Sequence, residues 1–257
     1  MNHYGKLTTV FVFDKNLKRY YSYIENEIME LSNKNIVSIF CNHKFSVSIE
    51  NLNKYYSIIV ASGFNSRFLP VSGAVQNHVQ NIYDCLENEN KLLTKNNFVI
   101  YARSSLSLIL SLFLIEKGKK VILVIKDTKP FVSEKNANMM YYFYRIFESS
   151  ASVYFNARVT KINEDNIDIM INKTLEPKSI KTLLKIFSNS RIKEESQLIN
   201  IDCNHLIYEP ETYPNNKLYV DIVNKKYKGE VYLVGNALEN SNLAEIIKSG
   251  YFVGKNI

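Results

Sequence analysis

The sequence predicts an α/β fold built on a parallel sheet, and three observations lead to this prediction. Several short apolar runs of strand length lie between polar turn residues, as in strands that are buried on both faces. One segment, 98–125, has the pattern of strand, helix and strand within roughly 30 residues. An amphipathic pattern closes the chain at 243–256. With 257 residues, the chain has the length of one large domain or two modest ones.

The first third of the chain predicts strands and one long helix. Leu7–Phe13 is rich in β-branched and aromatic residues and predicts a strand. Apolar residues then recur at helical spacing over 17–31, after polar residues that can cap a helix. The short apolar runs 36–40 and 56–61 predict buried strands, and the second of them ends in Gly63.

The strand-helix-strand segment is the clearest pattern. Phe98–Tyr101 predicts a strand, and Ser104–Lys117 carries leucines, isoleucine and phenylalanine on one helical face. Gly118 is expected to end this helix, because glycine adopts the left-handed conformation at low cost. Val121–Ile125 then predicts the next strand.

The rest of the chain predicts short strands between helices. A helix is expected over 133–147 and a closing helix over 243–256, with a further helical stretch near 180–187 inside the lysine- and serine-rich segment 174–197. The strand-like runs, of which the first three suggest a β-meander, are 153–155, 158–162, 167–171, 206–208 and 231–234.

Composition narrows the function classes. The chain is 46% hydrophobic and 22% charged, which is an ordinary globular balance. It has no apolar window of roughly 18 residues and no leader-like start, so we expect a cytoplasmic protein without a membrane span. The net charge of +7 is scattered rather than gathered on an aromatic-interleaved face, which makes nucleic-acid binding an unfavoured alternative.

Metal and redox chemistry is also unfavoured. The three cysteines, Cys41, Cys85 and Cys203, form no C-x-x-C pair, and the four histidines have no metal-ligand spacing. We therefore expect buried thiols and no metal site.

Three stretches, taken in order, carry a resemblance to a known family. The first is Ile58–Gly63, an apolar strand that ends in Ala-Ser-Gly, and the second is the unit 98–125. The third is Val231–Asn236, followed by apolar and glycine positions at 244–254. Together they resemble the C-terminal nucleotide-binding half of the flavoenzymes that include enoate reductase, dienoyl-CoA reductase and trimethylamine dehydrogenase.

The resemblance implies a fold of two Rossmann-like nucleotide-binding-type domains, the second inserted in the first. Residues 1–95 and 204–257 would form a remnant FAD-binding-type domain, and residues 96–203 the inserted NAD(P)-binding-type domain. FAD and NAD(P) are the cofactors that it implies.

The NAD(P) fingerprint is altered at each glycine. In G-x-G-x-x-G, glycines permit a tight turn, close backbone approach to the pyrophosphate and close helix packing. The matching positions here are Ala102, Ser104 and Ser107. The acidic residue that would bind the ribose hydroxyls falls at Ile125, followed by Lys126.

Two alternatives follow for this site. Ser104, Ser105 and the helix N-terminus could still attract a phosphate, with help from Arg103 or Lys126. The favoured alternative is that the unit survives only as packing.

The flavin-contacting end is altered less. The family's aspartate, which hydrogen-bonds the ribityl chain of the flavin, corresponds to Asn236, and an amide can still make one such bond. Gly63, Gly235, and the helix start at Leu243 and Ala244 are the other flavin candidates that the resemblance implies. The family's first strand-turn-helix unit, which holds the ADP part of FAD, has no counterpart, because none of the eight glycines has its spacing.

These departures favour a degenerate member of this oxidoreductase fold, a pseudoenzyme that acts as a non-catalytic or accessory subunit. The alternative is one component of a split NAD(P)H:flavin oxidoreductase that transfers electrons with a partner chain. Neither cofactor is predicted to be retained in the first case, no catalytic residue is identified, and enzymatic activity is left open. Because a missing unit would expose unpaired strands, we expect Leu7–Phe13, a partner protein or a second copy to complete the sheet.

Two further groups of residues have plainer explanations. Glu209, Glu211 and Tyr213 lie before Pro214, and such acids in a loop are usually solvated, although paired carboxylates can act as acid and base. The aromatic run 141–144 could flank a flat ligand, but core packing is the favoured interpretation.

Overall fold

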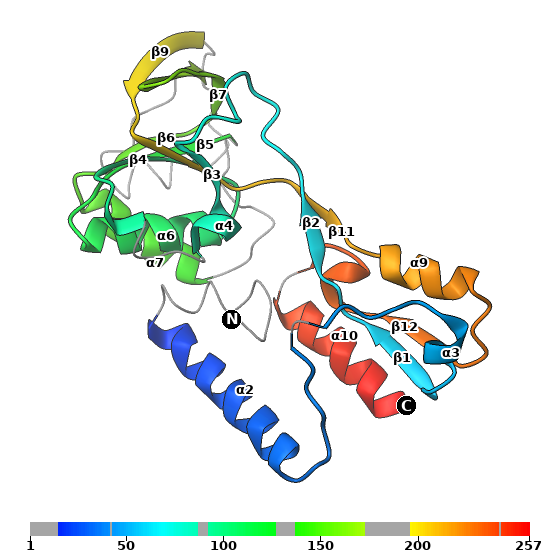
Figure 1. Cartoon of the computed structure of the whole chain (residues 1–257). Helices are drawn as coiled ribbons and strands as arrows, with labels where there is room; N and C mark the ends of the chain where they lie inside the picture. Colours follow the sequence, from blue (N-terminus) through cyan, green and yellow to red (C-terminus); the bar gives the residue numbers. More distant parts are fainter. Residues whose placement is uncertain (1–14, 42, 87–91, 127–136, 173–195, 242) are drawn as a thin grey trace. The chain divides into compact units, whose positions relative to one another are not determined.

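A computed structural model describes residues 15–41, 43–86, 92–126, 137–172, 196–241 and 243–257 (Figure 1). The expected strand at 7–13 and the helical stretch near 180–187 lie outside these residues. Long helix α2 (Lys15–Asn33) agrees with the helix predicted over 17–31. Beyond it, the contacts divide the chain into two compact units. We call residues 69–210 the inserted unit and residues 30–68 with 211–257 the flanking unit.

The inserted unit is built on a five-stranded parallel sheet of order β3-β10-β4-β5-β6. Neighbouring strands pair in register, with Val99 opposite Ile122 and Leu206 opposite Val99. The strands are β3 (Val79–Asn81), β4 (Asn97–Ala102), β5 (Lys120–Ile125), β6 (Ser152–Tyr154) and β10 (His205–Tyr208). The parallel sheet predicted from the apolar runs is therefore confirmed.

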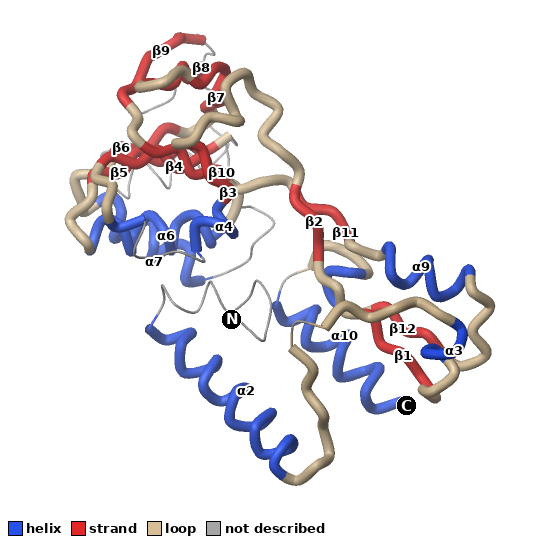
Figure 2. Tube along the Cα trace, in the orientation of Figure 1, coloured by secondary structure: helices blue, strands red, loops and turns tan. Residues whose placement is uncertain are grey.

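Two layers cover this sheet (Figures 1 and 2). Helices lie on one face, and a three-stranded antiparallel sheet lies on the other. The predicted meander is wrong in one strand: residues 152–154 pair in parallel within the five-stranded sheet, and residues 196–202, which were not predicted as a strand, form the third antiparallel strand. Side chains of β4 alternate between the layers: Phe98 and Ile100 belong to the cluster with the helices, and Val99 to the cluster with the second sheet. The covering elements are α4 (Ile82–Leu86), α6 (Ser105–Glu116), α7 (Ala137–Phe147), β7 (Ala157–Ile162), β8 (Asn166–Asn172) and β9 (Ser196–Asp202).

Local chemistry sets both ends of α6. Ser104 is the N-cap, and its hydroxyl accepts a hydrogen bond from the Leu106 N–H at 3.2 Å. Gly118 follows the helix with φ +72°. Its N–H donates to the Ile115 carbonyl and that of Lys119 to the Leu114 carbonyl, which together form a Schellman closure. The helix predicted over 104–117 is confirmed.

The flanking unit contains a two-stranded parallel sheet, in which Ser57 pairs with Glu230 and Val60 with Leu233. Leu52, Val60 and Ile222 form its small buried core. Its elements are α3 (Ile49–Leu52), β1 (Ser57–Val60), β2 (Phe64–Ser66), β11 (Thr212–Pro214), α9 (Lys217–Asn224), β12 (Glu230–Leu233), the short 3-10 helix η1 (Gly235–Ala237) and α10 (Leu243–Asn256). Strands β2 and β11 pair with each other in antiparallel fashion.

Two sequence predictions are wrong in this part of the chain. Residues 36–40 form neither strand nor helix, and Phe40 is 77% exposed. Cys41 is exposed, whereas Cys85 and Cys203 are buried as expected. A short apolar run has the same composition whether it enters a sheet or a surface segment, and the neighbouring strand decides between the two.

None of the helices that the structure describes is long and apolar enough to cross a bilayer. Within the same residues, no group of three His, Cys, Asp or Glu side chains is placed to hold a metal ion.

Candidate functional site: the amino end of α6

The turn from β4 into α6 is the position at which a parallel α/β sheet meets a nucleotide phosphate. Ala102 is the last residue of β4 and is 1% exposed. Ser104 caps the helix, and Ser107 lies at its first turn with its side chain fully buried. All three altered fingerprint positions thus lie at this turn, where each residue carries a side chain that glycine lacks.

The neighbouring strand brings an acidic residue to the same place. Strand β10 pairs with β4 in parallel, with Tyr208 opposite Tyr101. The N–H of Glu209 continues this ladder and donates to the Tyr101 carbonyl at 3.0 Å. Because both strands end at the same edge of the sheet, the Glu209 side chain lies at the start of α6, where it is 8% exposed.

The Glu209 carboxylate accepts four hydrogen bonds from this turn. Its Oε2 atom accepts from the Arg103 N–H at 3.1 Å, from the Ser104 N–H at 2.9 Å and from the Ser107 hydroxyl at 2.5 Å. The Ser104 hydroxyl donates to Oε1. Since all four groups are donors, the arrangement is complementary to an anion.

Burial and hydrogen bonding act in opposite directions on this group. Burial raises the pKa of the Glu209 carboxyl above its ordinary value, and the bonds from Ser104, Ser107 and Arg103 oppose that rise. The pKa of the nearby Tyr83 hydroxyl is also raised, mainly by burial and to a smaller extent by the charge of Glu209.

The prediction that Glu209 is a solvated loop acid is therefore wrong, whereas Glu211 and Tyr213 are exposed as expected. Local sequence patterns do not indicate that β10 lies beside β4, and this pairing brings Glu209 to the buried turn. A glutamate that directly follows an apolar run is the one signal that could have identified it.

The ribose-binding position on the next strand is apolar. Ile125 ends β5 opposite Ala102 and is fully buried, and the half-buried Lys126 follows it. A buried isoleucine offers no acceptor for ribose hydroxyls.

The flavin candidates lie in the flanking unit, where polar groups bond to one another. Gly63 and Gly235 follow β1 and β12 with φ of +73° and +60°. The Gly235 N–H donates to the Ser249 hydroxyl at 2.9 Å, and Asn236 Oδ1 accepts from the Ser241 N–H at 2.9 Å. Asn236 thus uses its amide oxygen within the turn that leads to α10.

Helix α10 begins at Leu243, and the next residue, Ala244, is exposed. The predicted site residues therefore form two groups, one in each unit: Ala102, Ser104, Ser107 and Lys126 in the inserted unit, and Gly63, Gly235, Asn236, Leu243 and Ala244 in the flanking unit.

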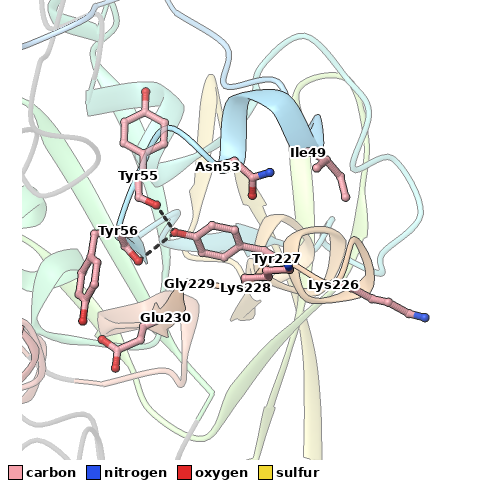
Figure 3. A pocket seen from close by; sticks show the side chains of 9 residues that line it. All are labelled: Ile49, Asn53, Tyr55, Tyr56, Lys226, Tyr227, Lys228, Gly229 and Glu230. Carbon is pink, nitrogen blue, oxygen red and sulfur yellow. Dashed lines mark hydrogen bonds between the residues drawn. The ribbon is translucent and has the colours of Figure 1, made fainter.

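A separate hollow of about 610 Å³ lies in the flanking unit and contains none of the predicted site residues (Figure 3). The Tyr227 hydroxyl donates there to the carbonyl oxygens of Tyr55 at 2.6 Å and Tyr56 at 3.0 Å. These residues precede Ser57 and Glu230, the first residues of β1 and β12. Ligands of parallel α/β sheets bind at the opposite, carboxyl ends of the strands, so this hollow is not at the nucleotide position.

No protein-family model matches this sequence, and no curated protein sequence is significantly similar to it. Solved structures are similar in fold. A 2-naphthoyl-CoA reductase in complex with 2-naphthoyl-CoA aligns with 97% of this chain at a TM-score of 0.75 and 17% identity. An amine oxidase for 6-hydroxypseudooxynicotine from Pseudomonas geniculata N1 aligns with 93% at a TM-score of 0.70 and 14% identity.

The chain spans 34% of the length of each of these two proteins. Thioredoxin reductase from T. acidophilum, of which it spans 62%, is also similar, at a TM-score of 0.51 and 14% identity over 77% of this chain. The resemblance drawn from the sequence is therefore confirmed for the fold: this chain has the fold of the FAD- and NAD(P)-dependent oxidoreductases.

Proposed function

We propose that this chain is a non-catalytic or accessory protein on an oxidoreductase scaffold, acting through another protein rather than through a bound dinucleotide. The observation that carries the proposal is the Glu209 carboxylate, which occupies the amino end of α6 and uses four of its hydrogen-bond donors.

A dinucleotide would have to displace this carboxylate. A pyrophosphate brings negative charge to the same donors, and two anions in a buried site repel each other strongly. The Ala102, Ser104 and Ser107 side chains also reduce the space at the turn. Binding would further lack the ribose contact, because Ile125 offers no acceptor.

The flanking unit supports a role in assembly. Two strands form its parallel sheet among the residues that the structure describes, and such a small sheet needs further packing for stability. On α10, Ile247 is 60% exposed, Tyr251 70% and Phe252 68%. We propose that a partner protein, a second copy or the segment 7–13 completes this sheet, as the sequence led us to expect.

The visible spectrum of the purified protein tests the function. We expect a colourless protein without flavin absorbance, and no saturable change when NADH or NADPH is titrated by fluorescence or calorimetry. A stoichiometric FAD content, or micromolar binding of either nucleotide, would contradict the proposal. Light scattering measures the oligomeric state. A monodisperse monomer in which residues 7–13 form no strand would contradict the proposed completion of the sheet.

The second candidate function is a component of a split NAD(P)H:flavin oxidoreductase. Gly63 and Gly235 favour it, because both keep the left-handed backbone at the strand ends, and the space beside Gly63 is open. This candidate predicts flavin absorbance and NAD(P)H oxidation when the chain is mixed with FAD and the products of neighbouring genes. The accessory role predicts neither.

A further inference from the structure

We propose that the amino end of α6 is an oxyanion site occupied by the chain's own Glu209, and that phosphate or a small carboxylate binds there once this side chain is removed. The inference rests on the proposed loss of dinucleotide binding and deepens it, since it attributes that loss to an internal competitor at a site that is otherwise competent.

The donors at this turn form a cradle that depends on more than a helix end. Two backbone N–H groups, of Arg103 and Ser104, point to the same oxygen atom as the Ser107 hydroxyl, at 3.1, 2.9 and 2.5 Å. Oxygens of phosphates and carboxylates are bound in this way at helix amino ends, where the helix dipole adds to the hydrogen bonds. The Ser104 hydroxyl engages the second oxygen.

A carboxyl group of the protein itself occupies the cradle, so these donors already bind a pair of oxygens of the kind that phosphate and carboxylates carry. Glu209 reaches it from another strand, 102 residues beyond Ser107 in sequence. Its carboxylate is withdrawn from water, at 8% exposure, and the donors compensate for that loss of hydration. A buried carboxylate at this place is therefore bound much as an external anion would be.

Tethering explains why an external anion does not compete. Glu209 is held at the end of β10 by the ladder bond to Tyr101, so its carboxylate reaches the cradle without the loss of translational freedom that a free ion undergoes. We expect the wild-type protein not to bind phosphate at concentrations that saturate the site in a variant without the Glu209 carboxylate.

The test compares the wild type with Glu209→Ala and with the control Glu211→Ala, which removes an exposed acid two residues further on. Thermal unfolding is followed during titration with sodium phosphate and sodium formate, against sodium chloride at equal ionic strength. We expect Glu209→Ala to have a lower Tm, which both anions raise saturably by on the order of 3 °C or more. The wild type and Glu211→Ala should show no saturable rise.

The outcomes separate this inference from the proposed function. A folded Glu209→Ala protein that neither anion stabilises overturns the inference and leaves the accessory role untouched. A saturable rise of equal size in the wild type also overturns it, because the site would then not be self-occupied. Micromolar NADH binding by the wild type would instead overturn the proposed function.

If Glu209→Ala does not fold in the sodium chloride buffer, a refolding experiment replaces the thermal titration. The yield of folded protein is then measured with and without formate. A gain with formate supports the inference, and an unchanged yield contradicts it.

Discussion

The buried hydroxyl of Ser107 offers a measure of how tightly the Glu209 carboxylate is bound. Ser107→Ala removes a fully buried hydroxyl that donates to Oε2 at 2.5 Å. Hydrogen bonds to charged groups contribute about 1.5–3 kcal/mol, so we expect the free energy of unfolding to fall by roughly that amount. Urea denaturation followed by circular dichroism measures it.

Ser111→Ala is the matched control. Ser111 lies one turn further along α6, is also fully buried, and donates to the neutral Ser107 carbonyl at 2.6 Å. A neutral bond is expected to contribute about 0.5–1.5 kcal/mol. Because both changes put alanine into the same helix, the gain in helix propensity largely cancels between them.

A double-mutant cycle with Glu209→Gln isolates the pair. If Ser107 acts through the carboxylate, Ser107→Ala should have a smaller effect in the Glu209→Gln background, with a coupling of about 1 kcal/mol. The reasoning fails if Ser107→Ala is no more destabilising than Ser111→Ala, or if the cycle shows additive effects.

Two further predictions concern titratable groups. Burial raises the pKa of the Glu209 carboxyl, so the native state binds the carboxyl proton more tightly than the unfolded state does. The free energy of unfolding of the wild type, measured relative to Glu209→Gln, should therefore fall as the pH rises from about 4 through the native pKa. Urea titrations across pH measure this, and a difference that rises with pH would contradict it. For the thiols, burial raises the pKa of Cys85 to about 12 and that of Cys203 to about 11, whereas Cys41 is exposed. At neutral pH, a thiol reagent should label Cys41 in the native protein, and Cys85 and Cys203 only after unfolding. Rapid labelling of both Cys41 and Cys203 in the native Cys85→Ala variant would refute this prediction.

Local patterns predicted the strand-helix-strand segment of the inserted unit well. The segment 98–125 has a strand, a helix and a strand because its apolar spacing, the Ser104 cap and the Gly118 stop all favour the same structure. Each of these signals acts within a few residues along the chain, so it can be identified without knowledge of the tertiary fold.

Weaker local signals were missed. Strand β3, strand β2 and helix α4 are three to five residues long, too short for a periodic pattern to form. Residues 36–40 show the converse failure, since an apolar run alone did not produce a strand. In both cases tertiary contacts decide the structure, and the local sequence does not contain them.

The candidate site divides in the same way. Ala102, Ser104 and Ser107 lie at the turn into α6, and this position could be predicted because the strand and helix that flank them were identifiable. It could not place Glu209, which is brought there by the pairing of β10 with β4 across more than 100 residues of chain. The missing information was strand order, to which composition and spacing contribute little.

The order of strands also gives residue 209 its influence over the site. In a parallel sheet, adjacent strands end side by side, so the residue that follows β10 is necessarily near the donors that follow β4. A small side chain at that position would leave the donors facing solvent or a ligand, whereas a glutamate has the length and the charge to satisfy them from within. On this scaffold, one residue outside the glycine fingerprint can therefore decide whether the amino end of α6 accepts an external anion, and a fingerprint read alone would not reveal it.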